Sequence, residues 1–287
     1  MTLPSADPAP VAAGSLPLPD PAAVGRILRE VAAAVILPRF RNLVAGDVSH
    51  KRHPRDLVTI ADIEAERELE QRLASLLPGC AFVGEEAAEG RPEVLAALAG
   101  GQPVWLLDPV DGTRNFAAGS VCFAVIVGFC AGGKTLAGFI LDPLSGRMLW
   151  AMAEQGAWLE TAEGCTRVHV ARERPLGEMT GSLARRSAER LQARLAERGE
   201  AAPSATRYGS VGREYMDLAT GTLDFASYAR LKPWDHAAGV LIHREAGGFS
   251  ALRGNGAPYR PAPFIVEDVL LLAPDAESWH RLHRLLG

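Results

Sequence analysis

Residues 105–116 read WLLDPVDGTRNF, and this stretch carries the strongest structural signal in the chain. An apolar run delivers Asp108 to the end of a predicted strand, Pro109 is expected to stop that strand, and a second carboxylate follows at Asp111. Gly112 and Thr113 come next, where a small side chain lets an anion approach the backbone amides. Two carboxylates three residues apart on a sharp turn can bridge hard cations, so the stretch predicts a metal site. An ordinary Asx-turn is the alternative, because Asp-Gly pairs are common in loops.

Helical and strand patterns are mixed on both sides of this stretch, and several of the strands are paired as hairpins. This mixture favours an α+β or layered α/β fold over a regular alternation of strand and helix. The patterns predict helices at 21–45, 62–77, 92–99, 187–198, 211–220, 235–246 and from 275, and strands at 80–84, 104–107, 121–130, 135–142, 147–152 and 157–159.

Residues 128–135 read GFCAGGKT and match the letters of a nucleotide-binding P-loop. A P-loop ends a strand and opens a helix, whose free amides hold the phosphates. Here the following residues, TLAGFILDP, are typical of a second strand. Because paired glycines suit a tight turn, Gly132 and Gly133 predict a β-hairpin instead of a nucleotide site.

The whole chain has 287 residues, 48% hydrophobic and 22% charged, with a formal net charge of −4. The lysines are scattered, so no nucleic-acid partner is expected. Residues 1–20 are rich in Pro and Ala and predict a disordered extension, not a secretory signal. The longest apolar stretch, 121–131, is too short for a membrane span. The four cysteines include no C-x-x-C pair, and Cys122 and Cys130 predict reduced core thiols, so we expect a soluble, cytoplasmic protein.

Three further acidic segments accompany the first one. Glu85 lies in GEE at 84–86, after a short strand, and could be an ordinary turn acid. Asp235 lies in WDHAAG at 234–239, where Asp is also a favoured helix N-cap. Asp62 ends the segment DLVTIAD at 56–62 and could simply open a helix. Each alternative is reasonable alone, but the joint occurrence of the segments in this order favours one shared site.

At this point the chain resembles the inositol monophosphatase family, a group of Mg²⁺-dependent, lithium-inhibited sugar phosphatases. The WLLDPVDGTRNF and WDHAAG segments carry the resemblance, which runs from about residue 25 to the end. It implies a layered α-β-α-β-α fold, usually in a homodimer. The phosphatase domain is expected at 21–287, with a metal-binding half up to about residue 180 and a second half at about 181–287.

The resemblance also implies a role for individual residues. Glu85, Asp108 and the Val110 carbonyl are expected to bind a first metal ion. A second ion would lie between Asp108, Asp111 and Asp235, and a third, weaker Mg²⁺ near Glu85 also occurs in the family. The remaining expectations are Asp62 and Thr113 as the pair that orients and deprotonates the attacking water, Lys51 (five residues before Asp56) as a lysine near the metals, the Gly112 and Thr113 amides as the phosphate cradle, and Gly209 and Ser210 of RYGSVG at 207–212 as the substrate side.

One segment departs from the family. Where inositol-cleaving members carry a glutamate that binds sugar hydroxyls, this chain has Tyr228, followed by Arg230 and Lys232. We expect Tyr228 and Arg230 at the substrate, and a substrate with a second anionic group is one hypothesis. Alternatively, the two cations point to solvent or to a dimer partner. His236, beside Asp235, is expected on the helix surface or in a supporting role.

The expected activity is Mg²⁺-dependent hydrolysis of a small phosphate monoester, such as an inositol phosphate or a related sugar phosphate, by a metal-activated water. Oxygen ligands suit Mg²⁺ better than zinc. A 3′-phosphonucleotide, histidinol phosphate or a sugar bisphosphate are alternative substrates. A non-catalytic module on the same fold is a further alternative, which the full set of carboxylates argues against.

Overall fold

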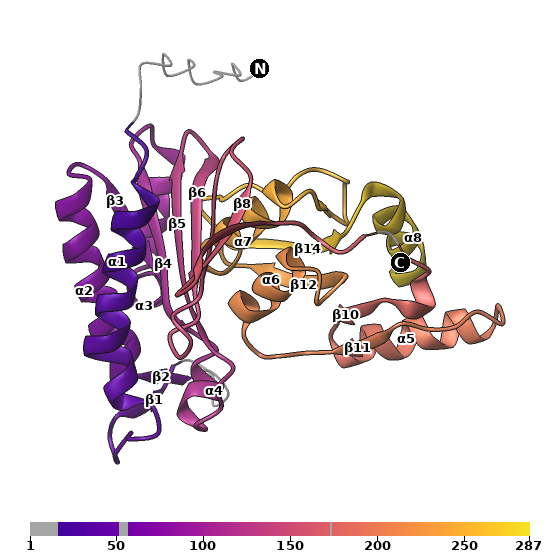
Figure 1. Ribbon diagram of the computed structural model, residues 1–287, viewed down its shortest axis with the longest axis horizontal. Helices are drawn as coiled ribbons and strands as arrows, with labels where there is room; N and C mark the ends of the chain where they lie inside the picture. Colours follow the sequence, from indigo (N-terminus) through magenta and orange to yellow (C-terminus); the bar gives the residue numbers. More distant parts are fainter. Residues whose placement is uncertain (1–16, 52–56, 173) are drawn as a thin grey trace, which may run out of the picture.

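The elements of the chain form five layers. The computed structural model describes residues 17–51, 57–172 and 174–287. From left to right, Figure 1 shows helices, a seven-stranded sheet, helices, a five-stranded sheet and helices again. This arrangement confirms the predicted α-β-α-β-α fold. Of the predicted extension at 1–20, residues 1–16 lie outside the described part of the chain.

The seven-stranded sheet belongs to the first half of the chain. Its order is β3-β4-β5-β6-β7-β8-β9, and only the β3–β4 pair is parallel. All residues of β4 are buried, because helices cover both faces of the sheet at its centre. The strands are β3 (Ala81–Gly84), β4 (Val104–Asp111), β5 (Ala124–Ala131), β6 (Lys134–Leu141), β7 (Met148–Met152), β8 (Ala157–Thr161) and β9 (Gly164–Val168).

Two helices cover the outer face of this sheet, α1 (Pro21–Val31) and α2 (Ile60–Leu76). The predicted single helix at 21–45 is wrong in extent. After α1 the chain forms a π-helical turn at Ala32–Ile36 and a 3₁₀ turn at Leu37–Arg39. Pro38 lacks a backbone N–H and cannot continue the α-helical ladder. A small antiparallel hairpin, β1 (Val48–His50) with β2 (Leu57–Thr59), precedes α2.

The middle layer consists of α6 (Val211–Ala219) and α7 (Pro233–Glu245), which pack between the two sheets. Helix α7 crosses β6 closely: a Cβ atom added to Gly138 would lie 2.8 Å from the backbone oxygen of Ala238. Since no side chain larger than hydrogen fits there, the glycine sets the spacing of this helix from the sheet.

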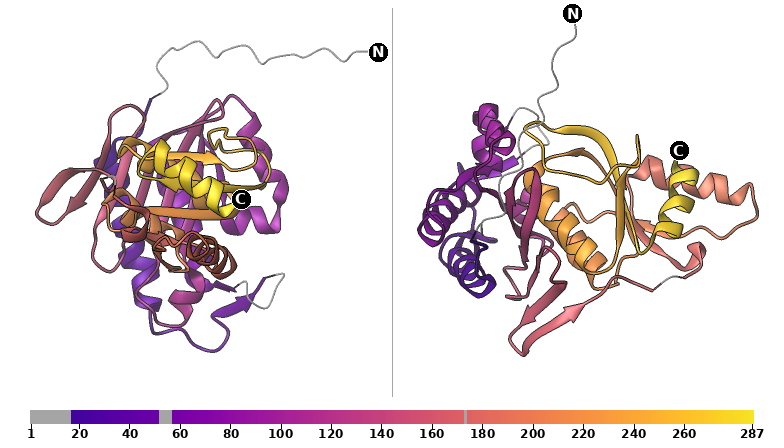
Figure 2. Two further views of the ribbon diagram at one scale, coloured as in Figure 1. Left: turned by 90° about the vertical axis from the view of Figure 1, so that its right-hand side faces the viewer. Right: turned by 90° about the horizontal axis from the view of Figure 1, so that it is seen from above.

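The five-stranded sheet and its outer helices come from the second half of the chain, and the sequence patterns missed this sheet. Its order is β11-β10-β12-β14-β13, and Figure 2, from above, shows it on the far side of the middle helices. The elements are β10 (Thr180–Ser182), α5 (Arg185–Ala196), β11 (Ser204–Thr206), β12 (Phe225–Leu231), β13 (Phe249–Leu252), β14 (Val266–Ala273) and α8 (Ala276–Leu286).

The P-loop look-alike is a hairpin, as predicted. Strands β5 and β6 pair antiparallel up to Ala131 and Lys134, and Gly132 and Gly133 form the turn with positive φ angles.

The strand expected from residue 121 begins only at Ala124, and the helix expected at 92–99 is a 3₁₀ segment, Pro92–Ala99. The remaining short elements are α3 (Glu85–Gly90), α4 (Thr113–Ala117) and a 3₁₀ turn at Leu176–Glu178. Among the described residues, no helix has the length and apolar composition needed to cross a membrane.

Candidate active site

Strand β4, the second strand of the seven-stranded sheet, carries Asp108 and Asp111 at its C-terminal end. Contrary to the prediction, β4 does not stop at Pro109 but continues to Asp111. The pairing of β4 with β5 shifts register between Asp108 and Asp111, which marks a bulge. A bulge tolerates proline, because its residues need not donate to the ladder, and it redirects the side chains beside it.

Three carboxylates meet at this end of β4. Glu85 opens α3 directly after β3, Asp108 lies on β4, and Asp235 lies in the first turn of α7. One oxygen of each lies within 4.8 Å of the other two. In the described part of the chain, Asp108 Oδ1 is buried and has no hydrogen-bond partner. An oxygen-only donor set with a buried, unpaired carboxylate oxygen fits a hard divalent cation such as Mg²⁺.

The electrostatics of this carboxylate cluster point the same way. Burial raises the pKa of Asp108 well above its ordinary value, and the neighbouring Glu85, Asp111 and Asp235 raise it further. Burial likewise raises the pKa of Asp235, against the attraction of Lys232. These carboxylates oppose each other's ionisation, and a bound cation would relieve their mutual repulsion.

Asp111, by contrast, is turned toward α6. Its carboxylate accepts hydrogen bonds from Val211 N at 3.1 Å, from Gly212 N at 2.7 Å and from the Ser210 hydroxyl. Burial raises its pKa to about 7, although these donors lower it. The structure thus gives Asp111 a contact that the sequence did not indicate, and it ties the predicted Gly209-Ser210 turn to β4. A cation at Asp111 would have to share oxygens that already accept hydrogen bonds.

Asp62 and Thr113 lie next to each other in the structure. Thr113 Oγ1 lies 3.1 Å from Asp62 Oδ1 and 3.1 Å from the Val110 carbonyl oxygen. The other oxygen of Asp62 accepts from the Thr59 hydroxyl at 2.5 Å and from Thr59 N at 2.9 Å. Burial raises the Asp62 pKa to about 6, although these hydrogen bonds lower it. Thr59 caps α2, so the position of Asp62 follows from the start of that helix.

The turn after Asp111 strongly favours glycine, since Gly112 has a φ angle of +89° and an added Cβ would lie 3.0 Å from the Ser210 Cβ. Asn115, for which the sequence analysis predicted no role, joins this turn to the second half of the chain. Its amide donates to the backbone oxygens of Cys122 and Tyr208, both at 2.8 Å. The only sequence signal for Asn115 was its place in the TRNF end of the decisive stretch.

Two lysines surround Glu85. Lys51, expected near the metals, lies 3.2 Å from Glu85 and 2.7 Å from Glu86. Lys232 was expected at the substrate, in solvent or at a dimer partner, but lies 2.9 Å from Glu85 and 3.4 Å from Glu89. Burial alone would raise the pKa of Glu85, yet Lys232 and Lys51 outweigh it and lower that pKa. Burial raises the pKa of Glu86 to about 8 despite Lys51. Asp56, from which the position of Lys51 was counted, lies outside the described residues.

The predicted substrate residues Tyr228 and Arg230 do not join this site through any described contact. Tyr228 is 2% exposed, and its ring lies 5.0 Å from that of His236. The Arg230 side chain is 74% exposed, and its nearest carboxylate, Glu267, is 3.9 Å away. Tyr228 on a buried strand face is therefore a core residue with no free surface for a ligand.

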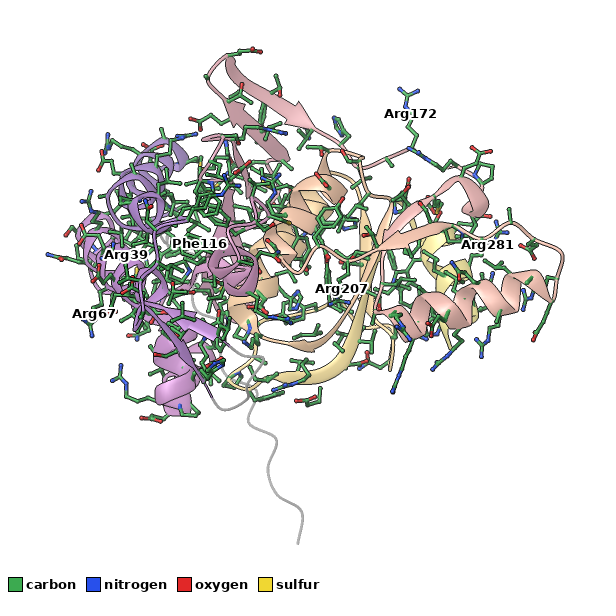
Figure 3. All side chains as sticks on the ribbon, turned by 90° about the horizontal axis from the view of Figure 1, so that it is seen from below. Arg39, Arg67, Phe116, Arg172, Arg207 and Arg281 are labelled. Carbon is green, nitrogen blue, oxygen red and sulfur yellow. The ribbon has the colours of Figure 1, made fainter. Side chains whose placement is uncertain are left out.

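His236 is buried instead of lying on the helix surface. Its Nδ1 lies 3.1 Å from the Tyr215 hydroxyl, and burial lowers its pKa to about 3. The imidazole is therefore neutral near pH 7 and faces the core. Arg207 packs over the Tyr228 ring at 5.7 Å. Figure 3, seen from below, shows Arg207 in the middle of the molecule, far from Arg39 and Arg67 in the outer layer.

Comparison with known proteins shows which family has this arrangement of residues. The family model described as "Inositol monophosphatase family" matches residues 22–285. The chain belongs to the inositol monophosphatase family. The inositol-1-monophosphatase SuhB of Mycobacterium tuberculosis is 35% identical over 236 residues, covering 78% of this chain and 80% of that protein. A Thermotoga maritima protein named fructose-1,6-bisphosphatase/inositol-1-monophosphatase is 28% identical over 224 residues, covering 78% of this chain and 80% of its own length.

Solved structures agree on the fold. An IMPase of Thermotoga maritima superposes with a TM-score of 0.74 at 23% identity, covering 91% of this chain and 94% of that one. The inositol monophosphate-bound SaIMPase-II gives a TM-score of 0.70 at 21% identity, covering 92% and 91%. As a member of this family, the protein is an enzyme. It is a phosphatase that acts on phosphate monoesters.

Proposed function

We propose that this enzyme is a Mg²⁺-dependent phosphatase for a small phosphorylated polyol or sugar, such as an inositol phosphate. One observation carries the proposal: Glu85, Asp108 and Asp235 converge within 4.8 Å, and Asp108 Oδ1 is buried without a partner among the described residues. These carboxylates and the Val110 carbonyl would hold the ions, with Asp111 as a ligand that also caps α6. Bound Mg²⁺ would neutralise the phosphate and acidify a water molecule.

The residues beside the metal ligands supply the rest of the chemistry. Asp62 holds the Thr113 hydroxyl at 3.1 Å, so the pair can orient a water and take its proton through Thr113. The first amides of α4, at Gly112 and Thr113, have no acceptor within their helix and can bind phosphate oxygens. Lys51 lies beside Glu85 and adds positive charge at the side of the cluster.

The substrate proposal rests on the family and on the names of relatives, which include inositol-1-monophosphatases and a fructose-1,6-bisphosphatase/inositol-1-monophosphatase. Lys232 is paired with Glu85 and Glu89, and Arg230 lies near Glu267, so neither supports a pocket for a second anionic group. We therefore favour a monophosphate over a bisphosphate.

The experiment is phosphate release from a panel of esters: inositol 1-phosphate, fructose 1,6-bisphosphate, a 3′-phosphonucleotide and histidinol phosphate. Each is assayed with Mg²⁺, with EDTA, and with Mg²⁺ plus Li⁺. We expect Mg²⁺-dependent, Li⁺-inhibited turnover that is fastest for inositol phosphate. Full activity in EDTA would refute the metal proposal, and a bisphosphate turned over fastest would refute the substrate proposal.

We also propose a cytoplasmic homodimer without a nucleic-acid partner. The family resemblance supports the dimer, and the four free cysteines suit a reducing compartment. Light scattering after size-exclusion chromatography should give twice the 30.5 kDa of one chain.

A further inference from the structure

Glu66 lies on α2 four residues after Asp62, so both side chains are on the same face of the helix. Its side chain is buried, and its two carboxylate oxygens are both used. One accepts from Glu86 N and the other from Ala87 N, each at 2.9 Å. These amides belong to the first turn of α3, where backbone N–H groups have no acceptor in their own helix.

Gly84 provides the space for this contact. A Cβ atom added to Gly84 would lie 2.2 Å from the Glu66 carboxyl carbon, a distance that real Cβ atoms do not adopt. The clash involves a buried carboxyl group that is fixed by two hydrogen bonds, so it cannot move aside without losing them. Glu66 on α2 and Gly84 at the end of β3 therefore depend on each other: the carboxyl group fits only because Gly84 has no side chain.

Glu85 lies in the chain between Gly84 and Glu86, two residues that contact Glu66. Its carboxylate belongs to the cluster with Asp108 and Asp235. Helix α3 has only six residues, too few to hold its own conformation, so its direction must be imposed by contacts from outside. The Glu66 carboxylate also suits the positive end of this short helix.

We propose that Glu66 is a positioning residue which, with Gly84, fixes the direction of Glu85 for metal binding. This inference rests on the proposed function only in assigning the cluster to Mg²⁺. Glu66 itself lies outside the carboxylate cluster, so it acts through the backbone of α3 and not as a ligand.

The test uses Glu66→Gln in the full-length protein. Glutamine keeps the shape but turns an N–H₂ group toward one of the two amide donors, so one hydrogen bond is replaced by a repulsion. Calorimetric titration with Mg²⁺ and with Mn²⁺ should show about 10- to 100-fold weaker binding, the usual effect of removing a group that orients a ligand. The Mg²⁺ concentration for half-maximal activity should rise by the same factor, while kcat at saturating Mg²⁺ stays near the wild-type value.

Gly84→Ala attacks the same contact from the other side and should give the same phenotype. In the double variant the two losses should not add, because both remove one interaction. Glu68→Gln is the matched control: Glu68 lies on the same helix and pairs with Arg72 at 2.7 Å, so metal binding should not change. Circular dichroism checks that each variant is folded.

Wild-type metal affinity in a folded Glu66→Gln or Gly84→Ala variant would overturn the inference, as would a fall in kcat that saturating Mg²⁺ does not restore. If one variant does not fold, the other decides. If the wild-type protein binds Mg²⁺ but hydrolyses no ester, the proposed function fails while the positioning role remains testable by titration. If the wild-type protein binds no metal at all, both fail.

Discussion

At the scale of single residues, the buried carboxylates explain both why the site suits a cation and why it costs free energy when no cation is bound. Asp108 is 2% exposed and faces Glu85, Asp111 and Asp235, which all raise its pKa. Without a cation, the folded protein must either protonate Asp108 or hold a buried charge among like charges. Both cost free energy, and because the unfolded chain ionises near its ordinary pKa of 3.8, the cost grows as the pH rises above that value.

Asp108→Asn should therefore separate stability from activity. In EDTA we expect a higher melting temperature than the wild type, by about 2–4 °C per kcal/mol gained, and a larger gain at pH 8 than at pH 5. With Mg²⁺ the order should reverse, since the variant loses the stabilisation that a bound ion gives. Turnover should fall by several orders of magnitude. Near-wild-type turnover would contradict the ligand assignment.

At the scale of elements, the distance between α7 and the seven-stranded sheet is set by glycine. Gly138 on β6 meets the backbone of Ala238, whereas its partner across the ladder, Gly128 on β5, has room for a methyl group at 3.5 Å from the Leu106 Cβ. Helix α7 also carries Asp235, so the packing distance and the position of a proposed ligand are linked.

Gly138→Ala should lower the free energy of unfolding by about 1–3 kcal/mol, the usual cost of overpacking. It should also weaken Mg²⁺ binding, because α7 must move away from β6. Gly128→Ala is the matched control and should do neither. Urea unfolding and Mg²⁺ titration of both variants measure this, and equal effects of the two substitutions would argue against the close approach as the cause.

The elements near the decisive stretch could be predicted, because their signals are local. The hairpin at Gly132 and Gly133 follows from strand patterns on either side of a turn, and Asp108 follows from its place after an apolar run. The bulge at Pro109 could not be foreseen, because it depends on the partner strand β5. The second sheet was also missed, since β10 and β11 have only three residues each and the longer strand β12 pairs with β10 and β14, which lie far from it in the sequence.

Several contacts of the site depend on folding and had no local signal. The two amides that bind Glu66 lie about twenty residues further along the chain, because the contact joins α2 to the first turn of α3. Lys232 finds Glu85 across 147 positions, which a pattern of neighbouring residues cannot indicate. The burial of Tyr228 also had no local signal, because it depends on the packing of β12.

At the scale of the whole molecule, the site joins both halves of the chain. Asp108 lies on the seven-stranded sheet and Glu85 directly follows its strand β3, whereas Asp235 comes from the middle layer, which the second half supplies. Most residues of α7 in that layer are buried. His243 on α7 is 1% exposed, neither ring nitrogen finds a partner among the described residues, and burial lowers its pKa to about 4.

His243 should make the fold sensitive to acid. The unfolded chain takes up a proton near pH 6.5, but the folded protein does so only near pH 4. The contribution of His243 is therefore complete above pH 6.5 and falls by about 1.4 kcal/mol per pH unit between these values. Urea unfolding of the wild type and His243→Gln from pH 8 to 4.5 should give stabilities whose difference changes with this slope. The exposed His169→Gln is the control, and a pH-independent difference for His243→Gln would contradict the prediction.

The hairpin turn between β5 and β6 has a practical consequence. Side chains added at Gly132 and Gly133 would meet no described atom within 4 Å. The turn is therefore a place where the chain could be opened to new termini, or where a reporter sequence could be inserted. The carboxylates of β4 would not be disturbed, because Asp111 pairs with Ala124 at the start of β5, at the other end of that strand. A segment that imitates a nucleotide-binding loop would then serve as an engineering handle for the enzyme.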